Sequence, residues 1–178
     1  MLLIQLSGLS GSGKTTISYN TRRELENRGF KAEVIDGDVY RNGLCRDLGF
    51  SRADRIENIR RLGFVGDLLA GHGIVAILSA INPYEEAREA LRQSSGRVRT
   101  VWIECDLETL RSRDTKGLYR RAFLPDSDPE KLTNLTGVND PYEIPANPDL
   151  VIRTAIESEA ESSDRLLQYI LKEIGNNV

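Results

Sequence analysis

Apolar residues recur in short runs along this 178-residue chain, and longer segments with helical spacing separate the runs. The runs cover residues 2–6, 32–35, 74–78, 98–103 and 150–152. Each run is nearly continuously apolar rather than alternating, as expected for parallel strands that are covered on both faces. The pattern therefore predicts an α/β fold, with a doubly wound, parallel, five-stranded sheet and helices on both faces.

The spacing of apolar residues also predicts two amphipathic helices. Between residues 55 and 69 the apolar positions recur at steps of three or four, which places them on one face of a helix. The tail over residues 157–174 carries a similar apolar stripe after an acidic start. We expect this second helix only to pack against the core.

Residues 114–148 break this pattern. The segment holds five of the six prolines, with Asp, Ser, Thr and Asn between them and few apolar runs. We expect it to lie outside the core of a single domain that spans residues 1–178. Loops of this length in compact domains are usually functional lids or disordered segments. The basic residues Lys116, Arg120 and Arg121 favour a mobile lid over phosphates.

Composition and charge are those of an ordinary globular protein, with 39% hydrophobic residues, 29% charged residues and a net charge of −3. Binding to many nucleic-acid phosphates requires a broad basic face, so no nucleic-acid partner is expected. No apolar run approaches about 18 residues, so no membrane span is predicted. Cys45 and Cys105 lack metal-ligand spacing and are expected to be free thiols of a cytoplasmic protein.

The clearest chemical motif follows the first predicted strand. Residues 8–16 read Gly-Leu-Ser-Gly-Ser-Gly-Lys-Thr-Thr and match the phosphate-binding loop (P-loop) pattern G-x-x-x-x-G-K-[ST] between a strand and a helix. Its glycines let main-chain N–H groups wrap phosphates, and the helix that begins near Lys14 directs its dipole at them. A chance match in a flexible turn is the alternative, and the strand-to-helix context argues against it.

This motif predicts a site for Mg-ATP. Lys14 is expected to reach the β- and γ-phosphates as a catalytic residue, and Thr15 to bind Mg²⁺. The predicted ATP-binding residues are Gly8, Ser10, Gly11, Ser12, Gly13, Lys14, Thr15, Thr16 and Arg113.

Two acids, Asp36 and Asp38, follow the second predicted strand at the carboxyl edge of the sheet, where open α/β folds bind ligands. Beside a magnesium nucleotide, one acid can hold water on the metal while the other accepts the proton of an attacking hydroxyl. We predict both to be catalytic, with Asp36 at the metal. The alternative is an ordinary turn with a helix cap at Asp38.

Six arginines lie between residues 41 and 61, although the chain is negative overall. This concentration indicates an anionic substrate, because guanidinium groups bind phosphate or sulfate oxygens in a bidentate manner. We expect most of the six to be solvated and predict Arg41 and Arg55 to be ligands. Asn58 lies one turn after Arg55, and Phe50 offers a face on which a base can stack.

These residues resemble the adenylyl-sulfate kinase family, whose members transfer the γ-phosphate of ATP to the 3'-hydroxyl of adenosine 5'-phosphosulfate. The resemblance spans nearly the whole chain and rests on an ordered set of motifs at residues 8–16, 36–38, 48–51, 54–61, 116–119, 136–137 and 140–143. It implies a P-loop NTPase-type kinase, Mg-ATP, adenosine 5'-phosphosulfate as the small-molecule partner, and a homodimer. The acceptor site that it implies is lined by Asp38, Arg41, Phe50, Arg55, Asn58, Ile81, Asn82, Lys116 and Leu135.

Three departures from the family pattern fall at the acceptor end. Asn82 replaces a serine that bacterial members can phosphorylate, which excludes a phosphoserine step but leaves direct transfer possible. Glu85 replaces an arginine that often follows Tyr84. The stretch 122–135 is longer than usual, and Leu135 replaces an aromatic residue that closes over the substrate base. Two alternatives therefore stay open: a kinase of the same family with another anionic nucleotide-linked acceptor, and a non-catalytic nucleotide-binding protein.

Overall fold

The computed structural model describes residues 1–176 and contains one five-stranded parallel sheet with the strand order β2-β3-β1-β4-β5. The strands are β1 (Leu3–Ser7), β2 (Ala32–Asp36), β3 (Val75–Ser79), β4 (Val98–Glu104) and β5 (Leu150–Arg153). Each predicted apolar run matches one strand to within one residue at either end. The predicted α/β class and the parallel five-stranded sheet are confirmed.

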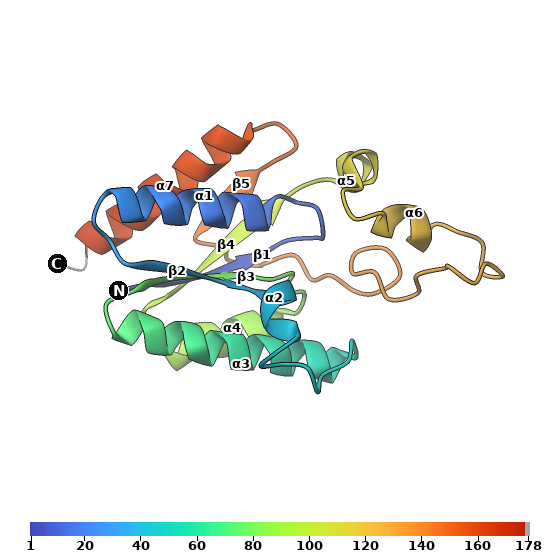
Figure 1. The fold of residues 1–178 in the computed structure, drawn as a ribbon, viewed down its shortest axis with the longest axis horizontal. Coiled ribbons are helices and arrows are strands. Elements are labelled where there is room, and N and C mark those ends of the chain that lie inside the picture. Colours follow the sequence, from blue (N-terminus) through green and yellow to red (C-terminus); the bar gives the residue numbers. More distant parts are fainter. Residues whose placement is uncertain (177–178) are drawn as a thin grey trace.

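Helices cover both faces of this sheet, as the sequence predicts (Figure 1). They are α1 (Lys14–Asn27), α2 (Gly37–Arg41), α3 (Arg52–Gly71), α4 (Glu85–Ser94), α5 (Leu107–Arg113), α6 (Leu118–Ala122) and α7 (Glu159–Gly175). Helices α1 and α7 lie on one face, and α3 and α4 lie on the other.

The two faces have separate hydrophobic cores, because successive side chains of a strand point to opposite sides. In β1, Ile4 and Leu6 belong to the core under α1 and α7, whereas Leu3 belongs to the core under α3 and α4. Strand β1 is therefore buried on both faces at the centre of the sheet. The loop that follows its carboxyl end starts from the most firmly packed strand.

The predicted lid, residues 114–148, extends away from the carboxyl edge of the sheet and includes α6 (Figure 1). The expectation that this segment contributes nothing to a core is wrong. Leu110, Tyr119, Ala122 and Leu135 are all buried together in a third hydrophobic cluster. These residues are too far apart in sequence to form an apolar run, and the folding of the loop brings them together.

Two expectations about the remaining chain can be compared with residues 1–176. Cys45 and Cys105 are both free thiols, as predicted. Within these residues, no helix combines the length and the apolar character that a membrane crossing requires.

Candidate active site

The P-loop joins β1 to α1 and has a backbone shape that only glycine adopts readily. Gly11 and Gly13 have φ values of 77° and 95°, in the left-handed region. A Cβ atom at Gly8 would lie 2.6 Å from the main-chain oxygen of Ile103 in β4, so the loop also packs closely against the neighbouring strand. These constraints explain why the motif places glycine at these three positions.

The amino end of α1 is open to a ligand. Within residues 1–176, no side chain caps this helix, whereas Ser51, Asp106 and Ser158 cap α3, α5 and α7. The first N–H groups of a helix need acceptors and attract anions. The loop and the helix end together therefore fit a phosphate group.

Lys14 is buried beside this helix end, with 8% of its surface exposed. Its Nζ donates to the main-chain oxygen of Leu9 at 2.7 Å and lies 3.5 Å from the Ser12 hydroxyl. The pKa of Lys14 is lowered from 10.5 to about 8, chiefly by burial and also by nearby Lys116, whereas Asp38 and Asp36 act in the opposite direction. A buried ammonium group without a directly bonded carboxylate is well suited to bind a phosphate anion.

Thr15 and Asp36 form the predicted metal site. The Thr15 hydroxyl donates to Asp36 Oδ2 at 3.0 Å, and Asp36 is 6% exposed. Within residues 1–176 no group of three or more His, Cys, Asp or Glu side chains is placed to hold a metal by itself. A hydroxyl and one carboxylate fit Mg²⁺, which commonly completes its shell with water and nucleotide phosphates.

The helix cap at this position is Asp36, not Asp38. Asp36 Oδ1 accepts the Asp38 N–H at 2.9 Å at the start of α2. The capping alternative considered for Asp38 is therefore wrong. Asp36 Oδ2 accepts from Thr15, and Asp36 Oδ1 is the atom that caps the helix. The Asp38 side chain is free to extend outward, and its Oδ2 lies 2.5 Å from Lys116 Nζ of the predicted lid.

Arg41, Phe50 and Arg55 meet at the opposite end of the site. The guanidinium carbons of Arg41 and Arg55 lie 4.4 and 5.5 Å from the centroid of the Phe50 ring. The two arginines also donate to the main-chain oxygens of Gly49 and Phe50, at 2.8 and 3.0 Å. Phe50 is 52% exposed, and an exposed ring beside two cations suits a ligand that is both aromatic and anionic.

Arg55 connects this cluster to the predicted lid. It is buried, and its Nη2 lies 3.0 Å from Asp140 Oδ2 and 2.9 Å from the main-chain oxygen of Asn134. Asn58 is buried one turn later, and its Oδ1 has no partner among the described residues. No individual role was predicted for Asp140, since one acid among several in a loop has no distinguishing sequence pattern.

The remaining predicted site residues have less direct positions. Arg113 donates to the main-chain oxygen of Thr154. The Thr154 hydroxyl in turn donates to the main-chain oxygen of Ser12, so Arg113 supports the P-loop indirectly. The Ile81 oxygen accepts the Gly8 N–H at 3.1 Å. Asn82 is 1% exposed and Leu135 is 5% exposed, so both side chains are turned into the protein. The main-chain oxygen of Asn82 is also occupied within the protein, since it accepts from the Ser7 hydroxyl at 3.0 Å and from Arg88 Nη1 at 2.7 Å.

The P-loop, the buried lysine, the Thr15–Asp36 pair and the covering segment define the class of P-loop kinases. Within this class, the chain belongs to the adenylylsulphate kinase family, whose model matches residues 1–153. This finding confirms the resemblance inferred from the motifs.

Individual relatives agree with this assignment. The chain is 43% identical to an adenylyl-sulfate kinase of Synechococcus sp. (strain JA-3-3Ab), over 94% of this chain and 92% of the relative. It is 44% identical to that of Microcystis aeruginosa (strain NIES-843 / IAM M-2473), over 89% and 85%. The structure of the Mycobacterium tuberculosis APS kinase in complex with AMPPNP and APS superposes with a TM-score of 0.88 and 36% identity, covering 95% of this chain and 96% of that chain.

Proposed function

We propose that this protein is an ATP-dependent kinase that transfers the γ-phosphate of Mg-ATP to the 3'-hydroxyl of adenosine 5'-phosphosulfate, giving 3'-phosphoadenylyl sulfate and ADP. The observation that carries the proposal is the Arg41–Phe50–Arg55 cluster at one end of a site whose other end is a P-loop. This cluster offers a stacking surface and two cations, which match an adenine and its anionic phosphosulfate.

The donor end holds and neutralises the nucleotide. Mg-ATP supplies the phosphoryl group that is transferred. Thr15 and Asp36 hold the metal, and Lys14 together with the P-loop N–H groups binds the phosphates. Catalysis then consists mainly of positioning and charge neutralisation.

The acceptor end orients the hydroxyl that attacks. Phe50 stacks on the adenine, and Arg41 and Arg55 bind the phosphosulfate oxygens. Asp38 accepts the proton of the 3'-hydroxyl, and Lys116 of the lid lies beside it. Transfer is direct, because Asn82 cannot carry a phosphate.

The test is a comparison of acceptors. Purified protein is incubated with Mg-ATP and adenosine 5'-phosphosulfate, AMP, ADP or CDP, while ADP release is followed and the products are identified by mass. We expect 3'-phosphoadenylyl sulfate to form with clear preference and Lys14→Met to slow its formation about 10³-fold. Turnover only on another acceptor would favour a family member with a different substrate. ATP binding without any turnover would favour a non-catalytic protein.

We also propose that the protein is a cytoplasmic homodimer. Each copy is a single domain of residues 1–178, with residues 114–148 as a mobile lid. Residues 177 and 178 lie outside the described residues. Helix α3 leaves Phe64 and Leu68 exposed one turn apart, at 68% and 53%, which supports a contact between copies. One structural relative is a hexameric APS kinase from Thiobacillus denitrificans, at 26% identity, a TM-score of 0.70 and coverage of 97% of this chain but 29% of that chain. Light scattering on purified protein tests the dimer, and a monomer mass would contradict it.

A further inference from the structure

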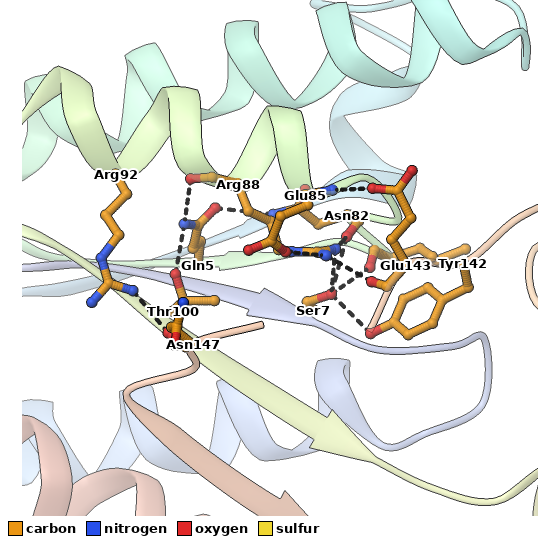
Figure 2. A network of polar contacts seen from close by, with 11 residues as sticks. Gln5, Ser7, Asn82, Glu85, Arg88, Arg92, Thr100, Tyr142, Glu143 and Asn147 are labelled. Atoms are coloured by element: carbon orange, nitrogen blue, oxygen red, sulfur yellow. Dashed lines mark hydrogen bonds and ion pairs between the residues drawn. The ribbon is translucent and has the colours of Figure 1, made fainter. Parts of the chain in front are cut away.

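A fully buried arginine lies beneath the acceptor end of the site. Arg88 of α4 is 1% exposed, and its guanidinium group reaches the carboxyl ends of β1 and β3 (Figure 2). It forms an ion pair with Glu85 one turn earlier, at 2.5 Å between Nη2 and Oε2. The charge of Arg88 is thus balanced within the protein, and the residue is not itself available to a ligand.

The other bonds of Arg88 connect three segments of the chain. Nη1 donates to the main-chain oxygen of Asn82 at 2.7 Å and to the Ser7 hydroxyl at 3.4 Å, and Nη2 donates to the main-chain oxygen of Glu143 at 2.6 Å. Ser7 directly precedes the P-loop, and Asn82 lies in the loop after β3. Glu143 belongs to the last part of the predicted lid, which returns to β5. One side chain therefore fixes three elements that border the site.

The returning segment, residues 140–143, is named the strap. The Tyr142 hydroxyl lies 2.9 Å from the Ser7 hydroxyl, and the Glu143 N–H donates to the Pro83 oxygen at 2.8 Å. Glu143 Oε2 accepts the Glu85 N–H at 2.7 Å, so the strap also caps the start of α4 (Figure 2). With the Arg88 bond, these contacts dock the strap on α4 and β1.

The strap begins with the residue that orients Arg55. Asp140 Oδ2 lies 3.0 Å from Arg55 Nη2, and both side chains are largely buried, at 21% and 8% exposure. A partly buried, charge-assisted contact of this kind fixes the direction of a guanidinium group. The strap therefore helps to hold Arg55 beside Phe50, together with the main-chain oxygens of Phe50 and Asn134.

We propose that Arg88 is a positioning residue for the acceptor: it holds the strap and the Asn82 carbonyl in place and, through Asp140, it sets the orientation of Arg55. The inference rests on the proposed function, because it assigns Arg55 to acceptor binding. Glu85, where the family often has an arginine, supplies the counter-charge that lets Arg88 stay buried. A buried cation that loses its partner is strongly unfavourable.

Three variants test this role. Arg88→Lys keeps the charge but loses the planar fork that reaches three segments. Asp140→Asn removes the charge that orients Arg55 and keeps the size of the side chain. The matched control is Arg92→Lys, since Arg92 lies one turn later on α4 and donates to the Asn147 oxygen at 3.0 Å and to Asp149 Oδ1 at 2.8 Å, away from Arg55.

We expect Arg88→Lys and Asp140→Asn each to raise the KM for adenosine 5'-phosphosulfate about tenfold, while the KM for ATP changes less than about twofold. Arg92→Lys should leave both KM values within about twofold of wild type. In the double variant Arg88→Lys/Asp140→Asn the two increases in the acceptor KM should not multiply, because both substitutions act through the strap. The effects of Arg92→Lys and Asp140→Asn on this KM should multiply, because these residues act independently. A wild-type KM for the acceptor in Arg88→Lys, or fully multiplicative effects, would overturn the inference.

The wild-type reaction separates this inference from the proposed function. If wild type does not phosphorylate adenosine 5'-phosphosulfate, the proposed function fails. The KM measurements on the same variants are then made with the acceptor that the substrate comparison identifies. If no acceptor is found, the test is hydrogen exchange of the Glu85 and Glu143 main-chain amides, which should be faster in Arg88→Lys than in wild type. Equally slow exchange in the two proteins would overturn the inference. If Arg88→Lys does not fold, Glu143→Ala removes the side chain that accepts the Glu85 N–H and loosens the same strap, and it should raise the acceptor KM in the same direction.

Discussion

The donor and acceptor ends of this site are built in different ways. The donor end consists of consecutive residues, 8–16, and binds mainly through main-chain groups that follow the central strand β1. The acceptor end consists of side chains from α2, from the loop that follows it, from α3 and from the predicted lid, which ion pairs such as Arg55–Asp140 bring together. The donor end is therefore rigid and local, whereas the acceptor end depends on contacts between distant segments. Substitutions that change the substrate specificity of the protein should therefore arise more easily at the acceptor end than at the donor end.

The largest effect is expected at the donor end. Lys14→Met removes the charge that neutralises the phosphates, and kcat should fall about 10³-fold. The measurement is steady-state ADP release with saturating substrates. Lys31→Met, at an exposed lysine, is the control and should keep wild-type activity. A loss of less than about tenfold in Lys14→Met would show that the P-loop main chain alone carries donor binding.

The same variant should stabilise the ligand-free protein. Folding lowers the pKa of Lys14 from 10.5 to about 8, so its charged form is disfavoured in the fold. The resulting penalty is complete below about pH 8 and disappears as pH rises toward 10.5, and it amounts to at most about 3 kcal/mol. Lys14→Met should therefore raise the free energy of unfolding in urea at pH 7, with a gain that shrinks between pH 8 and 10.5. A gain that does not depend on pH would contradict this cause.

At the acceptor end we expect a smaller effect that is confined to one substrate. Phe50→Leu removes the stacking face, and the acceptor KM should rise about tenfold while the KM for ATP stays within about twofold. Phe123→Leu is a matched control, because Phe123 of the predicted lid is 47% exposed and its ring centroid lies 4.3 Å from the guanidinium carbon of Arg111 in α5. Equal effects on the two KM values would show that the two ends are not independent.

The smallest effect is expected for the ion pair between the lid and α2 at the acceptor end. Lys116 and Asp38 form an ion pair whose side chains are 53% and 77% exposed, and exposed pairs stabilise proteins only slightly. Lys116→Met should change the free energy of unfolding by less than about 0.5 kcal/mol, measured in urea. A loss above about 1 kcal/mol would mean that the lid contributes to the stability of the fold.

The contrast between the two ends also explains what the sequence predicted. The five strands and the P-loop were predicted correctly because each is encoded by neighbouring residues. The lid cluster was missed because Leu110, Tyr119 and Leu135 come from separate places. Arg88 was missed because an arginine in a polar helix resembles a solvated residue, and only the folded strap shows that it is buried. Residues whose partners are distant in sequence leave no local pattern.

Asn82 has a consequence for the evolution of this chain. Its φ value is 47°, a left-handed conformation that asparagine adopts more readily than serine. Its amide donates to Gln5 Oε1 at 3.0 Å, while Gln5 Nε2 donates to the Arg88 oxygen and the Thr100 hydroxyl. A serine at position 82 would strain the main chain and leave a buried glutamine oxygen without its donor. Positions 5 and 82 should thus be epistatic, and we expect a lineage that acquires serine at position 82 to change residue 5 as well.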